Sequence, residues 1–260
     1  MNEKIQALLE RDVLRNIILL KTLAAYPEVA DCHVVGNAVL VLLPVRVSPF
    51  DRQTYPGVDT IVMLAGEDPE ELRALLPAIP RDERLVFKLN HPNQVEVFRP
   101  AFRLRRAIAY ISYTAPQESH FEPDAQVVIT RRPDEGCLAL FAAQGYGQEE
   151  IAEDFAQAVA HAFAIYTQGR PACACMAYRN HDRVFEIGAL HTLPGERRTG
   201  YARRVVLTAL AWVMGSGCVP RYAVHEQNEA SMRLAESVGL VRFLTTEHWV
   251  FEEPRYNKNP

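Results

Sequence analysis

The sequence has no apolar run near the roughly 18 residues that a membrane-spanning helix requires, so we expect no membrane association. Its first residues, MNEKIQALLERDVLRN, mix acidic and basic side chains and lack the basic start, apolar middle and cleavage site of a secretory leader. We therefore expect a cytoplasmic protein. Internal repeats and a Gly-Lys-Ser/Thr phosphate loop are also absent, which excludes a solenoid and the P-loop nucleotide hydrolases.

Cysteine is present without the pattern of a metal site or a disulfide framework. The five cysteines are an odd number, and none forms a Cys-x-x-Cys pair or lies at zinc-ligand spacing from a histidine. We predict no bound metal and no disulfide. Cys173 and Cys175 alternate within PACACMAY, so both should face the apolar core from one side of a strand.

An excess of basic residues is missing as well. The 28 lysines and arginines are outnumbered by 32 aspartates and glutamates, and no further basic stretch is interleaved with aromatic residues. A nucleic-acid binder needs a positive surface to meet the phosphates, so we expect no nucleic-acid partner. The 48% apolar composition is instead that of a globular chain with a substantial core.

Helical and extended patterns alternate along the first half of the chain, which predicts an α/β domain over residues 1–114. One helix has a clear start, with Asp68 at the N-cap and Pro69 at the first helical position. The polar segment APQESHFEPD, residues 115–124, has no periodicity and is predicted to be a linker. A second domain follows over residues 125–260.

The segment GERRTGYARR, residues 195–204, places four arginines around Gly200, between an apolar strand and a helix. The buried face of that helix is indicated by apolar residues at three- and four-residue steps, namely Ala202, Val205, Val206, Ala209, Leu210 and Val213. Unpaired N–H groups at a helix start attract anions, and clustered arginines there make most sense beside a polyanion such as a pyrophosphate. The alternative is a solvated charged turn.

Two motifs in this region resemble those of the GNAT superfamily of N-acetyltransferases. Arg197-x-x-Gly200-x-Ala202 resembles its pyrophosphate signature, Gln/Arg-x-x-Gly-x-Gly/Ala. Asn228, Ser231 and Gly239 follow a strand at the spacing of its second signature. The resemblance covers about residues 127–251 and is closest to the glycine N-acyltransferase-like and antibiotic-resistance branch, whose members carry a divergent N-terminal α/β domain.

The resemblance implies a mixed, mostly antiparallel sheet flanked by helices, and acetyl-CoA as co-substrate with no metal. The pyrophosphate would bind the turn, the pantetheine arm would pair with the strand edge at Leu190–Thr192, and Arg203 or Arg204 would reach a phosphate. The cofactor-binding residues predicted in this way are Leu190, His191, Thr192, Arg197, Arg198, Thr199, Gly200, Tyr201, Ala202, Arg203, Asn228 and Ser231.

Glu186 is the leading candidate for the catalytic base, because it precedes Arg197 by the same eleven residues as the glutamate of the histone-acetylating branch. Strand alternation puts Glu186, Gly188, Leu190 and Thr192 on one face and His191 on the other. His225, at a strand end, is a second catalytic candidate that could shuttle a proton, and a hydrogen-bonded strand-end histidine without a catalytic role explains it equally well. The alternative for Glu186 is a carboxylate paired with an arginine in the sheet.

The family's acid tyrosine is replaced by Ala235. Tyr201, Tyr222 or His225 would take its place, or the thiolate would leave unaided, or catalysis has been lost. We therefore predict an N-acetyltransferase in which a primary amine of a small molecule, amino acid or peptide attacks acetyl-CoA in a ternary complex. The alternative is a catalytically silent, CoA-binding regulatory module. The expected partner is a small-molecule amine or amino-acid acceptor, and a homodimer stays open.

Overall fold

The computed structural model describes residues 2–145, 147–157 and 159–251 of the chain. The chain forms two compact units: unit 1 comprises Met1–Tyr110 with Leu244–Pro260, and unit 2 comprises Ile111–Phe243. The polar segment 115–124 therefore lies inside unit 2. Two strands, β5 (Leu104–Thr114) and β11 (Val241–Phe251), run from one unit into the other.

Unit 1 has strands in the order β1-β2-β3-β4-β11, with β5 beside β11. All the described neighbour pairings among the first five are antiparallel except β3 with β4, which is parallel. The remaining elements of this unit are α1 (Glu3–Leu9), α2 (Ile17–Ala25), β1 (Asp31–Val35), β2 (Ala38–Pro44), α3 (Pro49–Thr54), β3 (Thr60–Ala65), α4 (Pro69–Leu75), β4 (Leu85–Leu89) and α5 (Pro92–Phe102). Short 3-10 turns precede α2, α3 and β4.

Unit 2 has strands in the order β5-β10-β9-β8-β7-β6. Strands β6 to β9 pair antiparallel, and β9 pairs parallel with β10. The elements are β6 (Val128–Thr130), α6 (Glu135–Ala142), α7 (Gln148–Ala156), β7 (Ala160–Thr167), β8 (Arg170–His181), β9 (Val184–Thr192), α8 (Tyr201–Gly215), β10 (Val219–His225) and α9 (Glu229–Ser237). The predicted α/β class with a mostly antiparallel sheet flanked by helices is confirmed.

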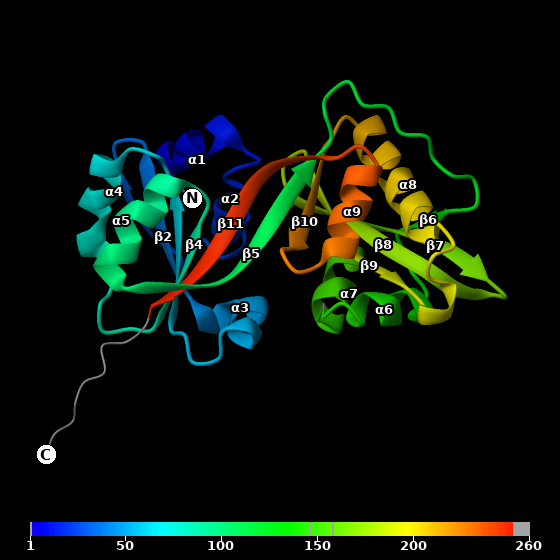
Figure 1. Cartoon of the computed structure of the whole chain (residues 1–260), viewed down its shortest axis with the longest axis horizontal. Coiled ribbons are helices and arrows are strands. Elements are labelled where there is room, and N and C mark those ends of the chain that lie inside the picture. The colour runs from blue at the N-terminus through cyan, green and yellow to red at the C-terminus, as the bar shows by residue number, and fades with distance from the viewer. Residues whose placement is uncertain (1, 146, 158, 252–260) are drawn as a thin grey trace, which may run out of the picture. The chain divides into compact units, whose positions relative to one another are not determined.

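Each sheet has an apolar core on both faces. In unit 1, α4 and α5 cover one face together (Figure 1), and α1 and α2 pack on the other. In unit 2, α8 and α9 pack on one face and α6 on the other. Strands covered on both sides carry continuous apolar runs, which is why β3 reads TIVMLA and is buried throughout.

The predicted inward face of α8 is confirmed, because Val205, Val206, Ala209, Leu210 and Val213 have no exposed surface. Cys173 and Cys175 are buried beneath this helix as free thiols, as expected for small core residues. Their burial raises the pKa of Cys173 to about 11 and that of Cys175 well above its ordinary value. None of the helices described is long and apolar enough to cross a bilayer.

Candidate functional site

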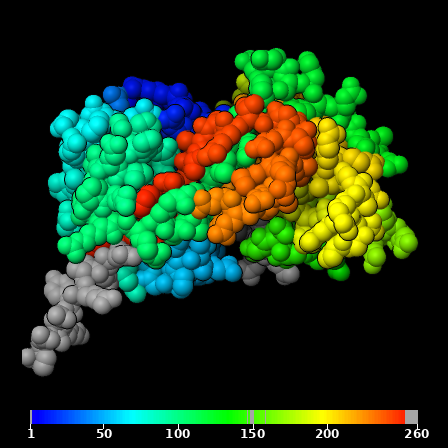
Figure 2. Space-filling model, viewed as in Figure 1, coloured from blue at the N-terminus to red at the C-terminus, as the bar shows by residue number. Residues whose placement is uncertain are grey.

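The turn between β9 and α8 forms an exposed corner of unit 2. It starts with a 3-10 turn at Pro194–Glu196 and ends at Gly200, the N-cap of α8, where φ is 85°. A side chain at Gly200 would meet no heavy atom within 4 Å, so the left-handed backbone requires glycine here and packing does not. In Figure 2 the yellow segment around residue 200 lies at the surface.

The start of α8 is uncapped. Gly200 offers no side chain, and the backbone N–H groups of residues 198–203 donate no hydrogen bond to any part of the chain that the structure describes. The first paired donor is the N–H of Arg204, which reaches the Gly200 carbonyl oxygen at 3.2 Å. Such donors, together with the positive end of a 15-residue helix, make an anion-binding corner.

The arginines around this corner differ in what they contact. Arg204 donates to both carboxylate oxygens of Asp124, at 2.6 and 3.0 Å, and these bonds lower the pKa of Asp124 to about 2. Arg197 makes only a long contact, 3.4 Å, to the Thr192 carbonyl oxygen. The side chains of Arg198 and Arg203 are exposed and accessible to an anion. Arg203 and Arg204 were the two arginines expected to reach CoA. Arg204 is bonded to Asp124 instead, whereas the side chain of Arg203 is exposed.

A bulge at Ala189 interrupts β9, where φ is 52°. Met176 of β8 pairs with Gly188 and Ala174 pairs with His191, so two steps on β8 face three on β9. The extra residue reverses the alternation beyond it. The prediction that side chains alternate between the two sheet faces without interruption from Glu186 to Thr192 is therefore wrong.

The bulge puts His191 on the same face as Glu186, towards α6, and not on the opposite face as predicted. Leu190 and Thr192 turn to the α8 face. Leu190 packs in the cluster beneath that helix, and the Thr192 hydroxyl donates to the Cys173 sulfur at 3.1 Å.

Strands β9 and β10 separate halfway along. Their parallel pairing consists of three residue pairs and ends at Glu186 and Arg221. Beyond that point β9 continues to Thr192 and β10 to His225 with no further pair between them in the described structure. The β9 backbone therefore has an edge that another hydrogen-bonding chain can meet, as an added strand would.

Glu186 lies at this last paired position and is only 8% exposed. Its Oε2 accepts hydrogen bonds from Arg221 Nη1 and, at 2.6 Å, from Asn180 Nδ2. Arg221 is 4% exposed and donates through Nη2 to the Ser112 hydroxyl at 3.0 Å. Glu186 thus has the arginine partner described above as the alternative to a base.

The two candidate histidines lie on the face of Glu186. His191 Nδ1 is 2.7 Å from Gln144 Nε2, and burial and Arg197 lower the pKa of His191, so its imidazole is neutral near pH 7. His225 follows Arg221 by four residues, on the side of β10 opposite the buried Tyr222. The His225 Nδ1 accepts a hydrogen bond from the Gln227 N–H at 3.2 Å.

The residues of the second signature make local contacts around α9. Asn228 is its N-cap, and Asn228 Oδ1 accepts from the Ser231 N–H at 3.1 Å. The Ser231 hydroxyl is 2.7 Å from the hydroxyl of Tyr222, whose pKa burial raises to about 12. Ala235, which replaces the family's tyrosine, is completely buried.

Sequence reasoning missed Arg221, Asn180, Ser112 and Gln144. A signal for Arg221 was present, since a single arginine interrupts the apolar pattern of VPRYAV, and a buried arginine requires a buried partner. The partners themselves lie on other strands, far away in the sequence.

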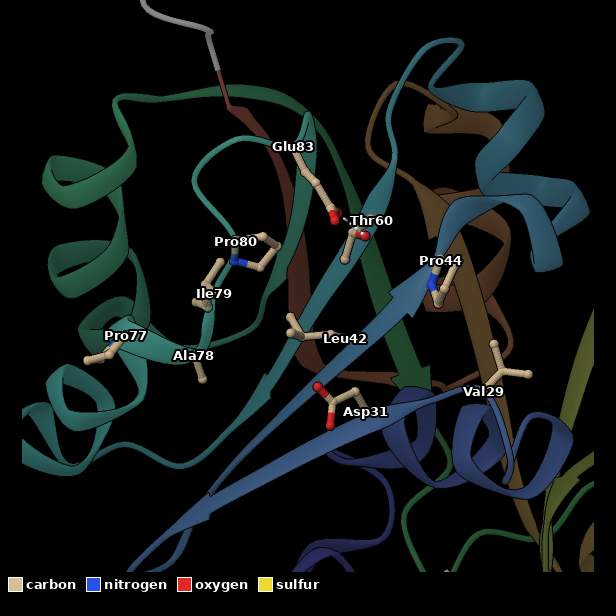
Figure 3. Close-up of a pocket in the computed structure, with 10 residues that line it drawn as sticks. All are labelled: Val29, Asp31, Leu42, Pro44, Thr60, Pro77, Ala78, Ile79, Pro80 and Glu83. Atoms are coloured by element: carbon tan, nitrogen blue, oxygen red, sulfur yellow. Dashed lines mark hydrogen bonds between the residues drawn. The ribbon is translucent and has the colours of Figure 1, made fainter.

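A pocket of about 360 Å³ lies in unit 1 and contains none of the predicted site residues (Figure 3). Apolar side chains such as Leu42 and Ile79 line it, and Asp31 and Glu83 lie at its edges. Glu83 accepts a hydrogen bond from the Thr60 hydroxyl at 2.5 Å. Within the described residues, no group of three or more histidine, cysteine, aspartate or glutamate side chains is arranged to hold a metal ion.

Residues 131–240 match the model of the acetyltransferase (GNAT) family. No protein of curated function matches the sequence. Solved structures with a similar fold include a GCN5-related N-acetyltransferase from Kribbella flavida, which is 17% identical with a TM-score of 0.60 and covers 92% of this chain and 96% of its own.

A GCN5-related N-acetyltransferase from Sphaerobacter thermophilus has 10% identity and a TM-score of 0.56, over 82% of this chain and 76% of its own. A tandem GNAT protein from the clavulanic acid biosynthesis pathway has 11% identity and a TM-score of 0.54, over 93% and 89%. These identities establish the fold alone. The match to the acetyltransferase (GNAT) family model is confined to residues 131–240, and both sequence signatures lie within that range.

Proposed function

We propose that the protein is an N-acetyltransferase that transfers the acetyl group of acetyl-CoA to a primary amine of a small molecule, an amino acid or a peptide. The observation that supports this most strongly is the uncapped start of α8, where six consecutive N–H groups, residues 198–203, have no partner among the described residues. In this proposal they bind the CoA pyrophosphate, and the exposed side chains of Arg198 and Arg203 add charge-assisted contacts.

In the same proposal the pantetheine arm occupies the gap between β9 and β10. The arm carries two amides, and the edge of β9 at Leu190–Thr192 supplies backbone groups that pair with amides. His191, near the end of β9, and Tyr201, the first residue of α8, flank the turn, and we assign them to cofactor binding on that ground. Asn228 and Ser231 act by holding the start of α9 beside the gap, because their observed contacts are with each other and with Tyr222.

For the chemistry, we propose direct attack of the neutral amine on the thioester carbonyl. The new C–N bond forms as the C–S bond breaks, the amine proton passes to a base, and the CoA thiolate leaves. Glu186 is our first candidate for that base and His225 the second, since both lie on one sheet face near the gap. A thiol with pKa near 8.5 is an acceptable leaving group, so no acid is required at Ala235.

A silent CoA-binding module is the second candidate function, and one observation favours it. The Glu186 carboxylate is occupied by Arg221 and Asn180, which makes it a poor proton acceptor unless that pair opens. In a silent module the corner and the gap would bind CoA, and no amine would release free thiol.

We also propose that residues 1–114 form a degenerate GNAT-like or accessory domain, as in the branch with a divergent N-terminal domain. Its β3, α4 and β4 follow one another in the same order as β9, α8 and β10, with parallel strands in both cases. A cytoplasmic location and a homodimer remain part of the proposal.

Calorimetric titration of the whole chain with CoA and acetyl-CoA tests the binding step. We expect one site per chain, because among the described helices only the start of α8 combines unpaired N–H groups with clustered arginines. Ligand at about a hundredfold its dissociation constant should add roughly 2.7 kcal/mol of stability. An amine panel followed by free-thiol release then separates the two candidates: release with any amine supports the enzyme, and CoA binding without release supports the silent module.

Glu186→Gln tests the base. The amide keeps the hydrogen bond from Arg221 but accepts no proton, so we expect a slower turnover with unchanged CoA affinity. Unchanged turnover would remove Glu186 from the mechanism and move attention to His225→Gln.

A further inference from the structure

Arg221 lies where β9 and β10 part. It occupies the last paired position of β10, opposite Glu186, and both side chains are almost completely buried. A buried ion pair is retained only where its geometry is good and its remaining groups are hydrogen-bonded. The position and the burial together single out this arginine.

The contacts of Arg221 cross the sheet instead of following one strand. Asn180 of β8 donates to Glu186 of β9, Glu186 accepts from Arg221 of β10, and Arg221 donates to Ser112 of β5. Four neighbouring strands are therefore tied at one level by side chains. Beyond this level the backbones of β9 and β10 have no pairing in the described structure. The network thus coincides with the vertex of the gap.

One donor of the guanidinium is not used. The Nε of Arg221 is buried and has no hydrogen-bond partner among the residues that the structure describes. Leaving a buried charged donor unsatisfied is unfavourable, and a carbonyl oxygen entering the vertex of the gap would satisfy it. The pantetheine arm has amide carbonyls and ends in a thioester carbonyl, whereas the phosphate end of CoA has none.

We propose that Arg221 is the positioning residue for the pantetheine arm: it fixes the point at which β9 and β10 separate and thereby sets the depth to which the arm enters. This rests on the acyl-CoA-dependent function proposed above. Arg221 acts through Glu186, through the strand spacing and through a hydrogen bond from its unpaired Nε to a carbonyl oxygen of the arm, and it takes no proton and forms no covalent bond. The turn at Arg198–Arg203 binds the phosphates independently of it.

Two ligands separate the arm from the phosphates. CoA carries both, and adenosine 3′-phosphate 5′-diphosphate carries the same phosphates without the arm. We expect Arg221→Lys to weaken CoA binding at least tenfold while changing the affinity for the diphosphate less than twofold. Lysine keeps the charge beside Glu186 but cannot also reach Ser112. Arg179→Lys, the same exchange on β8 outside the network, should change neither affinity.

Glu186→Ala, which unlike Glu186→Gln removes the acceptor for Arg221, and the double variant with Arg221→Lys complete the test. If Arg221 works through Glu186, the loss of CoA affinity in the double variant should be smaller than the product of the two single losses. Thermal unfolding of each variant identifies those that fail to fold. Arg221→Met removes the charge as well and is the most drastic variant. If Arg221→Met does not fold, Arg221→Lys and Ser112→Ala, which removes only the contact with β5, still provide the test.

The possible outcomes distinguish a failure of the proposed function from a failure of the positioning role. If the wild type binds neither ligand, the proposed function fails. If it binds CoA more tightly than the diphosphate and Arg221→Lys leaves that ratio unchanged, the positioning role of Arg221 is overturned while the proposed function stands. Equal weakening of both ligands would also overturn it, because general structural damage would then explain the loss.

Discussion

Two strand–turn–helix–strand segments of this chain share one connectivity and differ at the turn. In unit 1, β3 leads through α4 to the parallel strand β4, and in unit 2, β9 leads through α8 to the parallel strand β10. The start of α4 is capped by Asp68, whose Oδ1 accepts from the N–H groups of Glu70 and Glu71 at 2.8 and 3.1 Å. The start of α8 at Gly200 has no cap.

The charge at the two turns is opposite. Around Asp68 the side chains are acidic, with Glu67 before it and Glu70 after it, whereas arginines surround Gly200. An acidic, internally capped helix start repels an anion and has few donors left to offer. The shared connectivity alone therefore does not make an anion-binding corner. What distinguishes unit 2 is a helix start left without internal partners.

The parallel strand pairs β3–β4 and β9–β10 nevertheless share one feature. In unit 1 the last parallel pair is Met63 with Lys88, and the buried Lys88 ammonium donates to Asp51 at 2.8 Å. In unit 2 the last pair is Glu186 with Arg221, which are bonded to each other. A buried cation thus ends the parallel pairing in both units. This feature is therefore common to both units, and the two turns differ in capping and in charge.

The largest effect that we expect is that of Gly200→Asp, which gives α8 an acidic start like that of α4. The carboxylate would compete for the free N–H groups and repel a diphosphate. Loss of two charge-assisted bonds predicts CoA binding weaker by roughly a hundredfold or more. Calorimetry with CoA measures this, with thermal unfolding as the control for folding. Undiminished affinity would contradict the assignment of the corner.

Alanine at Gly66 and at Gly200 contrasts the two turns in stability. A Cβ at Gly66, where φ is 108°, would lie 2.9 Å from the Ala38 Cα, whereas one at Gly200 meets nothing within 4 Å. We expect Gly66→Ala to cost about 3 kcal/mol through overpacking and backbone strain, and Gly200→Ala only about 1 kcal/mol through its backbone. Urea unfolding measures both. Equal costs would mean that packing does not distinguish the turns.

The elements that could be predicted from sequence are those determined by local chemistry. The helix start at Asp68, the inward face of α8 and the strand–turn–helix around Gly200 all depend on residues close together in the chain, and the structure has them. The face of His191 could not be predicted. One extra residue at Ala189 reverses the alternation, and the single local sign of a bulge in EIGAL is Gly188, which does not show on which side the extra residue falls.

The partner of Glu186 could not be predicted from the sequence, for a different reason. The sequence indicated an arginine pair as an alternative, but the identity of Arg221 depends on β10 lying beside β9, which the helix between them brings about. Ser112 and Asn180 join the network only through the strand order of the sheet. Contacts of this kind follow from the fold and not from any local pattern.

Removing the cap of α4 tests, in unit 1, the contrast between a capped and an uncapped helix start. Asp68→Ala should lower stability by about 1 kcal/mol, because two backbone donors lose their acceptor. The affinity for CoA should stay the same, since the acidic turn takes no part in binding. Urea unfolding and calorimetry on the same samples test both statements, and a change in CoA affinity would show that unit 1 contributes to the site.

The smallest effect that we predict is a loss of stability in acid, at the half-buried pair between Asp124 and Arg204 beside the α8 corner. The Asp124 carboxyl has a pKa of about 2 in the folded chain against an ordinary value of 3.8, so the folded state binds fewer protons than the unfolded state in this range. The stability from the pair should therefore be complete above about pH 4 and disappear as the pH falls towards 2.

Urea unfolding of the wild type and Asp124→Asn across this pH range measures it. The two stabilities should differ above pH 4 and converge at low pH, where the aspartate is protonated and has no charge for Arg204. Unit 1 supplies the matched variant, Asp59→Asn, because Arg84 lowers the pKa of Asp59 in the same way. If the Asp124 difference persisted unchanged at low pH, the charge of the carboxylate would not be what stabilises its contact with Arg204.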